Sequence, residues 1–188
     1  MRLTLDTNCL IDLENGTGQA RAIRELITLH RAGKIQVFVS AISASENVIG
    51  QGSQPENLDQ FEARLKSLAI DDLPSVLPTG RNGMSFWGAA VYGDEKDDIG
   101  EKIKSIVHST VDTLTLTSKA RKVVCDVDGL AAHIRSGHDI FVTSDEHFRK
   151  HSRREALLAL GPKDILTPEE ALSKVLQGEP KEGPKGAY

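Results

Sequence analysis

Short apolar runs and longer amphipathic stretches alternate along the chain. The runs at 2–5, 35–39, 140–143 and 164–166 are mostly apolar or β-branched and stop at polar residues, which predicts buried strands. Apolar residues elsewhere recur every three or four positions, and the helices predicted from this spacing are 19–32, 56–68, 101–111 and 126–137. Strands that alternate with helices in this way predict an α/β fold with a mainly parallel sheet.

Capping and turn residues set further boundaries. Ser43 is expected to cap a helix over 43–49, and the residues 50–55 that follow are expected to form a loop. The prolines and glycines of 74–100 predict a loop with short helical pieces. Residues 167–170, Thr-Pro-Glu-Glu, predict a helix start with a Thr cap and a Glu three positions later. The Gly-, Pro- and charge-rich residues 178–188 predict a disordered tail.

The composition is that of an ordinary globular protein. The chain has 188 residues, of which 39% are hydrophobic and 27% charged, enough for one domain that we place at 1–177. No apolar run reaches the roughly 18 residues of a membrane span. Residues 1–8 show no signal-peptide pattern, so we expect a cytoplasmic protein that does not engage a membrane. Cys9 and Cys125 are too few for a disulfide scaffold, and we expect both to be buried.

Four acidic residues stand where strands end or helices begin. Asp6 follows the strand at 2–5, Asp145 follows the strand at 140–143, and Glu46 and Asp126 are expected in the first turns of helices. Sites in parallel sheets lie beyond the carboxyl ends of the strands, so the four carboxylates would converge if these helices begin at the same edge.

Such convergence favours a bound cation. Two carboxylates about 4 Å apart repel each other by about 4 kcal/mol at an effective dielectric constant of about 20. Oxygen ligands select Mg²⁺, Mn²⁺ or Ca²⁺ over zinc, and one or two such ions could assist the hydrolysis of a phosphodiester. The net charge of −4 argues against nucleic-acid binding through bulk electrostatics. Either the protein binds no nucleic acid, or a metal at the acidic cluster receives the phosphate.

Three of the four acids also have a purely structural interpretation. Ser43 and Glu46 fit a capping box, Asp126 could be the N-cap of its helix, and Asp145 could cap a short segment that contains Phe148. Asp6 has no such alternative, because no helix start is evident close enough to need a cap.

Five segments in order resemble the PIN domain family. They are Leu3 to Asp12 with its Asp-Thr-Asn, Val37 to Glu46, Asp126 to Gly137, Phe141 to Phe148, and Ile165 to Glu170. The resemblance implies a three-layer α/β/α fold and a Mg²⁺- or Mn²⁺-dependent ribonuclease, often the VapC-like toxin of a bacterial toxin–antitoxin pair. It therefore also implies an RNA substrate, an antitoxin protein and a homodimer as candidate partners.

The same resemblance implies a set of site residues. Asp6, Glu46, Asp126 and Asp145 would be the metal ligands and catalytic acids, with Thr7 and Asn8 as polar support. Asp128 would be either a supporting partner of the site or a solvent-facing charge, and we favour the latter. The segment 74–118 is longer than in compact toxins of the family, and its acidic run at 94–98 could be a lid, a partner surface or a solvated loop.

Further residues near the acids keep two interpretations each. Asp12 could extend the metal site through a water or be exposed, and Ser144, like Thr143, could orient a ligand or only complete the strand. Arg149, Lys150, Arg153 and Arg154 form a basic run after Asp145 that suits contacts with an RNA backbone or a solvated helix face.

Aromatic and histidine side chains are weaker candidates. His147 and His151 stand four apart and could chelate a metal on one helix, although no third ligand is near in sequence. Trp87 and Tyr92 could stack on a base or fill a small core.

Two rival functions remain. One is a catalytically silent RNA- or partner-binding module with the same fold. The other is a phosphoacceptor receiver domain, which would need a lysine after a late strand, where this chain has Asp145.

Overall fold

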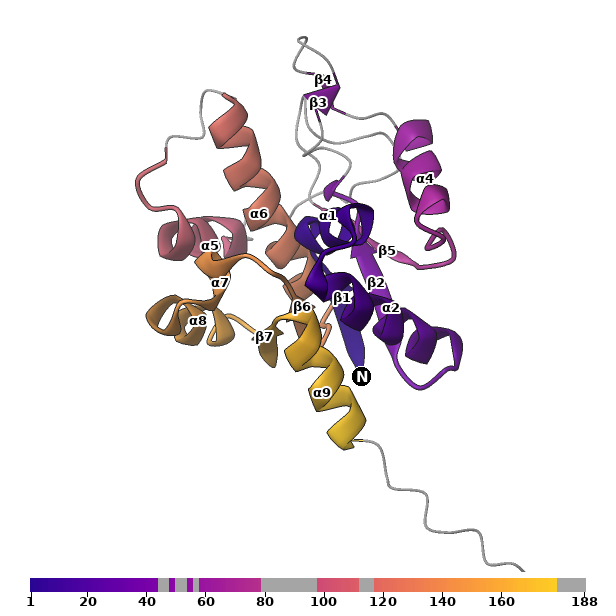
Figure 1. Ribbon diagram of the computed structural model, residues 1–188. Helices are drawn as coiled ribbons and strands as arrows, with labels where there is room; N and C mark the ends of the chain where they lie inside the picture. The colour runs from indigo at the N-terminus through magenta and orange to yellow at the C-terminus, as the bar shows by residue number, and fades with distance from the viewer. Residues whose placement is uncertain (44–47, 50–53, 56–57, 79–97, 112–116, 179–188) are drawn as a thin grey trace, which may run out of the picture.

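The chain folds around a five-stranded parallel sheet (Figure 1). The computed structural model describes residues 1–43, 48–49, 54–55, 58–78, 98–111 and 117–178. In order across the sheet, the strands are β5 (Ser75–Val76), β2 (Gln36–Ser40), β1 (Arg2–Leu5), β6 (Ile140–Val142) and β7 (Asp164–Leu166). This arrangement is the α/β fold with a parallel sheet that the sequence predicts.

The register of the sheet brings the strand ends to one level. Leu5, the last residue of β1, pairs with Val39 of β2 on one side and with Val142 of β6 on the other. Because all three strands run in the same direction, the residues that follow them meet at one edge. Asp6 and Thr143 are therefore neighbours although they lie far apart in the sequence.

Helices cover both faces of the sheet and make three layers. One face is covered by α1 (Thr7–Asn15), α2 (Gly18–Arg31), α4 (Leu58–Ser67) and α9 (Pro168–Gly178). The other face is covered by α5 (Ile99–Val107), α6 (Ser118–Arg135), α7 (Glu146–Arg149) and α8 (His151–Leu158). Successive strand residues alternate between the two cores, because side chains of a strand point to opposite faces. In β6, Val142 packs in the first core and Phe141 in the second.

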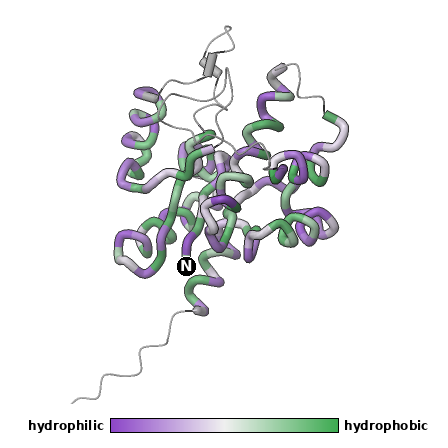
Figure 2. Tube along the Cα trace, turned by 180° about the vertical axis from the view of Figure 1, so that it is seen from behind, coloured by the Kyte–Doolittle hydropathy of each residue, from purple (hydrophilic) through white to green (hydrophobic). Residues whose placement is uncertain are grey.

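The helices bury one side each, as their amphipathic patterns predict. Figure 2 shows helices that alternate between hydrophilic and hydrophobic positions along their length. In α2 the buried positions include Ala20, Ile23 and Ile27, which recur at helical spacing. The chain reverses after α1 at Gly16, whose φ of 62° lies in the left-handed region that glycine adopts without strain.

Most of the predicted elements are confirmed. The strands expected at 2–5, 35–39, 140–143 and 164–166 correspond to β1, β2, β6 and β7, and the helices expected at 19–32, 56–68 and 101–111 to α2, α4 and α5. The predicted helix start at Thr167 is a reciprocal capping box. The Thr167 amide donates to Oε2 of Glu170 at 2.8 Å, and the Glu170 amide donates to Oγ1 of Thr167 at 3.1 Å.

Three predicted boundaries are wrong. The helix expected through Ile49 does not reach that far, because Val48–Ile49 form the strand β3. This strand pairs antiparallel with β4 (Gln54–Pro55), so the loop expected over 50–55 is shorter than predicted. Two β-branched residues in succession favour this extended conformation. The segment 74–100 contributes an edge strand, β5, that the prolines concealed.

The third error concerns α6, which begins at Ser118 rather than at Asp126. Thr117 caps it, since Oγ1 of Thr117 accepts a hydrogen bond from the Ala120 amide at 3.2 Å. Asp126 therefore lies in the middle of the helix, and its interpretation as an N-cap is wrong.

Some expectations fall outside the described residues. They concern Glu46, Trp87, Tyr92, the acidic residues 94–97 and the tail after Gly178. Among the helices that the structure describes, none is long and apolar enough to cross a bilayer.

Candidate acidic site at the carboxyl edge of the sheet

The topology creates a switch point between β1 and β6. The helices that follow β1, α1 and α2, pack on one face of the sheet, whereas α7 and α8, which follow β6, pack on the other. The chain thus leaves two neighbouring parallel strands in opposite directions, and ligands of open α/β sheets bind at such a switch point. The residues at this point are Asp6 after β1 and Thr143, Ser144 and Asp145 after β6.

Asp6 is a buried carboxylate directed at the switch point. Its side chain is 3% exposed. Oδ2 accepts hydrogen bonds from Oγ1 of Thr143 at 2.8 Å and from Nδ2 of Asn8 at 3.1 Å. Asp6 does precede a helix, since α1 begins at Thr7, so the expectation of no nearby helix start is wrong. Its side chain nevertheless makes no capping hydrogen bond.

Thr143 joins Asp6 to Asp145 through a single hydroxyl. While Oγ1 of Thr143 donates to Asp6, it accepts a hydrogen bond from the Asp145 amide at 3.0 Å. Thr143 is fully buried, so its hydroxyl has a fixed geometry. Two acids that are 139 positions apart in the sequence are thereby held at one point of the fold.

Asp145 also serves a structural role, as its sequence context predicts. It occupies the N-cap of α7, where Oδ1 accepts a hydrogen bond from the His147 amide at 2.7 Å. The same oxygen lies 2.9 Å from Nδ1 of His147. Capping therefore fixes the carboxylate and leaves it at the edge of the sheet, so the capping role and a site role are compatible.

Asp126 reaches this edge from the second helical layer. It is 5% exposed, and its Oδ2 lies 3.3 Å from Nε2 of His108, close enough for an ion pair although the two are not aligned as a hydrogen bond. Burial raises the pKa of Asp126, the contact with His108 opposes this, and the charge of Asp145 raises it further. Asp126 and Asp145 are therefore close enough to interact electrostatically.

Two histidines contact Asp126 and Asp145 at this edge, and nothing in the sequence predicted that they lie side by side. His108 ends α5 and contacts Asp126, while His147 contacts Asp145, and the centroids of the two rings are 5.6 Å apart. Sequence spacing could not reveal this pair, because His108 reaches Asp126 only through the packing of α5 on α6. His147 and His151 belong to different helices, so the suggested chelating pair on one helix is wrong.

The supporting residues also have defined contacts. Oγ1 of Thr7 lies 2.9 Å from Oγ of Ser43, and Asn8 donates to Asp6. Ser144 donates from Oγ to Oδ2 of Asp12 at 2.7 Å, which makes Asp12 a half-buried partner of the edge rather than an exposed residue.

Two further candidates differ from expectation. Asp128 is 1% exposed, so its interpretation as a solvent-facing charge is wrong. In the basic run, Arg154 forms an ion pair with Asp164, which also pairs with Lys174, and donates from Nε to the Ile165 carbonyl at 3.0 Å, so its side chain is already bound within the fold.

The donors at the edge suit a hard divalent cation, although they form no finished metal site. Within the described ranges, no three His, Cys, Asp or Glu side chains converge as metal ligands. Asp6, Asp126 and Asp145 offer carboxylate oxygens, which Mg²⁺ and Mn²⁺ favour. The raised pKa of Asp126 reflects burial and neighbouring negative charge, which a cation would offset.

We also compared the chain with known proteins. Searches against protein-family models, curated proteins and solved structures found no match.

Proposed function

We propose that the protein is a divalent-metal-dependent endoribonuclease whose site is the carboxyl edge of β1 and β6. Asp6, Asp126 and Asp145 would hold Mg²⁺ or Mn²⁺, together with Glu46. The observation that carries the proposal is the hydroxyl of Thr143, which joins Asp6 to Asp145 at the switch point of the sheet. The resemblance of five sequence segments to PIN domains supports the same assignment.

The electrostatics of the edge support a cation. Asp6 and Asp126 are both nearly buried, and Asp126 also faces the charge of Asp145. Buried carboxylates without a countercharge are costly, and His108 compensates Asp126 only in part, because the net pKa shift is still upward. A bound divalent cation would supply positive charge to the carboxylates and to the scissile phosphate.

The protein's own contribution would be to hold the acids in place. Thr143 and Asn8 fix the orientation of the Asp6 carboxylate, and His147 fixes that of Asp145. Ser144 similarly ties Asp12 to the edge. Because Asp6 is held by donors from two segments and Asp145 is held by His147, these two acids would need little reorganisation when substrate binds.

The proposal includes the partners that the resemblance implies. They are an RNA substrate, a protein inhibitor of the antitoxin type and a second copy of the chain.

Cleavage of mixed RNAs tests the proposal. The purified protein is incubated with RNA and Mg²⁺, Mn²⁺ or EDTA, alongside Asp6→Asn and the control Asp59→Asn, which changes an exposed residue of α4. Cleavage should require the metal, should be lost in Asp6→Asn and should persist in Asp59→Asn. A folded wild-type protein that binds RNA without cutting it under any of these conditions would favour the silent binding module instead.

A further inference from the structure

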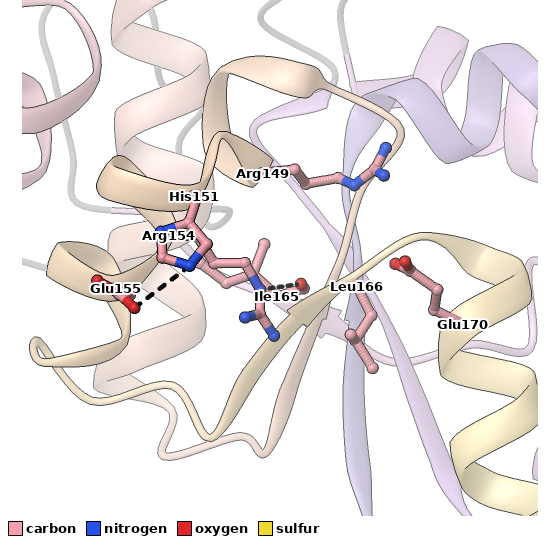
Figure 3. Close-up of a pocket in the computed structure, with 7 residues that line it drawn as sticks. All are labelled: Arg149, His151, Arg154, Glu155, Ile165, Leu166 and Glu170. Carbon is pink, nitrogen blue, oxygen red and sulfur yellow. Dashed lines mark hydrogen bonds and ion pairs between the residues drawn. The ribbon is translucent and has the colours of Figure 1, made fainter.

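A pocket lies between the last strand, β7, and the helices α7, α8 and α9 (Figure 3). Its volume is about 360 Å³, and it is lined by Arg149, His151, Arg154, Glu155, Ile165, Leu166 and Glu170. These residues come from α7, α8, β7 and the first turn of α9. A volume of this size, at the low end of the range for small-ligand sites, is large enough for one nucleotide.

Arg149 is the available cation of this pocket. The Arg154 side chain is already bound within the fold, by Asp164, which it shares with Lys174, and by the Ile165 carbonyl. Arg149 is half-buried, and its side chain makes no hydrogen bond or ion pair with any residue that the structure describes. A guanidinium in this state can form two parallel hydrogen bonds to a phosphate.

The pocket also carries two carboxylates: Glu155 lies away from Arg149, whereas Glu170 lies on the same side as Arg149 and keeps its charge. Figure 3 shows Arg149 and Glu155 at opposite ends of the pocket. Glu170, on the wall formed by α9, uses Oε2 to accept a hydrogen bond from the Thr167 amide. Between the two ends lies β7, where half-buried Leu166 provides an apolar surface.

The pocket adjoins the acidic site through both the chain and the sheet. Arg149 ends α7, the short helix that Asp145 caps. The strand at the base of the pocket, β7, is hydrogen-bonded to β6, whose end carries Thr143. The Thr143 amide donates to the carbonyl of Leu166 at 2.9 Å, so a residue of the pocket wall is bonded directly to a residue of the acidic edge.

We infer that this pocket binds the ribonucleotide next to the cleaved phosphodiester. Arg149 receives its phosphate, Leu166 contacts the sugar or base, and Glu155 accepts hydrogen bonds from base amino groups. The role as a substrate subsite rests on the proposed nuclease function, whereas the binding of a nucleotide does not. Continuity with the acidic edge favours a nucleotide over an acidic peptide as the occupant.

Binding of ribonucleoside 5′-monophosphates in EDTA tests this inference. Amide chemical shifts of ¹⁵N-labelled protein are followed while AMP, GMP, CMP or UMP is added to millimolar concentration. Shifts should map to α7, β7 and the start of α9, and Arg149→Ala should weaken binding about tenfold, the loss expected for one charge-assisted hydrogen bond. The control Arg24→Ala, an exposed arginine of α2, should bind like the wild type, and Arg149→Lys should be intermediate.

The outcomes separate this inference from the nuclease proposal. The pocket assignment would be overturned if no amide shifts were seen, or if the shifts mapped elsewhere. It would also be overturned if Arg149→Ala and Arg24→Ala bound nucleotide equally, or if an acidic peptide displaced the nucleotide. Nucleotide binding at the pocket without metal-dependent RNA cleavage would retain the pocket and reject the nuclease. Cleavage that is lost in Asp6→Asn but unchanged in Arg149→Ala would retain the nuclease and reject the pocket as a substrate subsite.

Discussion

The buried histidine of α6, His133, should make the fold sensitive to acid. Its ring is 0% exposed and packs against Phe141, with the ring centroids 5.5 Å apart. Its Nδ1 lies 2.9 Å from Oγ1 of Thr4, which also contacts Nδ1 of His138 at 2.9 Å. Burial, with a smaller contribution from the neighbouring His138, lowers the pKa of His133 from 6.5 to about 3.

The sign of the effect follows from proton binding. Between the unfolded pKa of 6.5 and the folded pKa of about 3, the unfolded chain binds a proton at His133 that the folded protein does not. Acidification in this window therefore favours unfolding, by about 1.4 kcal/mol per pH unit. From pH 7 to pH 5 the free energy of unfolding should fall by about 2 kcal/mol from this residue alone. That is a large part of a total stability of about 5–15 kcal/mol.

Urea unfolding at pH 7, 6 and 5 measures this loss. His133→Gln removes the titrating group and keeps a polar side chain for Thr4, so its stability should fall by about 2 kcal/mol less than that of the wild type over this range. His151→Gln, which changes a histidine whose side chain is 89% exposed, should keep the wild-type pH dependence. The reasoning is refuted if His133→Gln and the wild type lose stability equally between pH 7 and pH 5.

Three further substitutions test the edge and the ends of the helices. Thr143→Ala should lower the free energy of unfolding by about 2 kcal/mol and weaken Mn²⁺ binding, because Asp6 loses a hydrogen-bond donor. Thr143→Ser keeps the hydroxyl and should keep both properties. Equal effects of the two substitutions would contradict this prediction. Thr117→Ala should cost about 1 kcal/mol in thermal or urea unfolding and Thr117→Ser almost nothing, unless the cap of α6 contributes no stability. Gly16→Ala should cost about 1 kcal/mol at its φ of 62°, and an unchanged midpoint would count against that conformation.

Sequence patterns predicted four of the five strands of the parallel sheet, all but β5, and the places of two acids at its edge. The four strands are mostly apolar or β-branched runs that stop at polar residues, so the positions of Asp6 and Asp145 at strand ends follow from local spacing. Their meeting also required β1 and β6 to be parallel neighbours. The alternation of strands and helices predicts that the strands are parallel, whereas their adjacency is known only from the folded sheet.

The remaining features depend on tertiary packing. Buried Val123, Val124 and Val127 continue the helical spacing of α6, but the preference of Asp for N-caps suggested a start at Asp126. The contact of His108 with Asp126 arises from the packing of two helices. Burial of Asp128 could not be inferred, because an acidic residue in an amphipathic helix is usually solvated.

Calorimetric titration of the protein with Mn²⁺ at neutral pH tests the central claim most directly, since it depends on neither an RNA target nor a partner. The account predicts that the wild type and Asp59→Asn bind Mn²⁺ with equal affinity and that Asp6→Asn, still folded by circular dichroism, binds at least about tenfold more weakly, the loss expected for one charged contact. Absence of Mn²⁺ binding by the folded wild type, or unchanged affinity in Asp6→Asn, would contradict it.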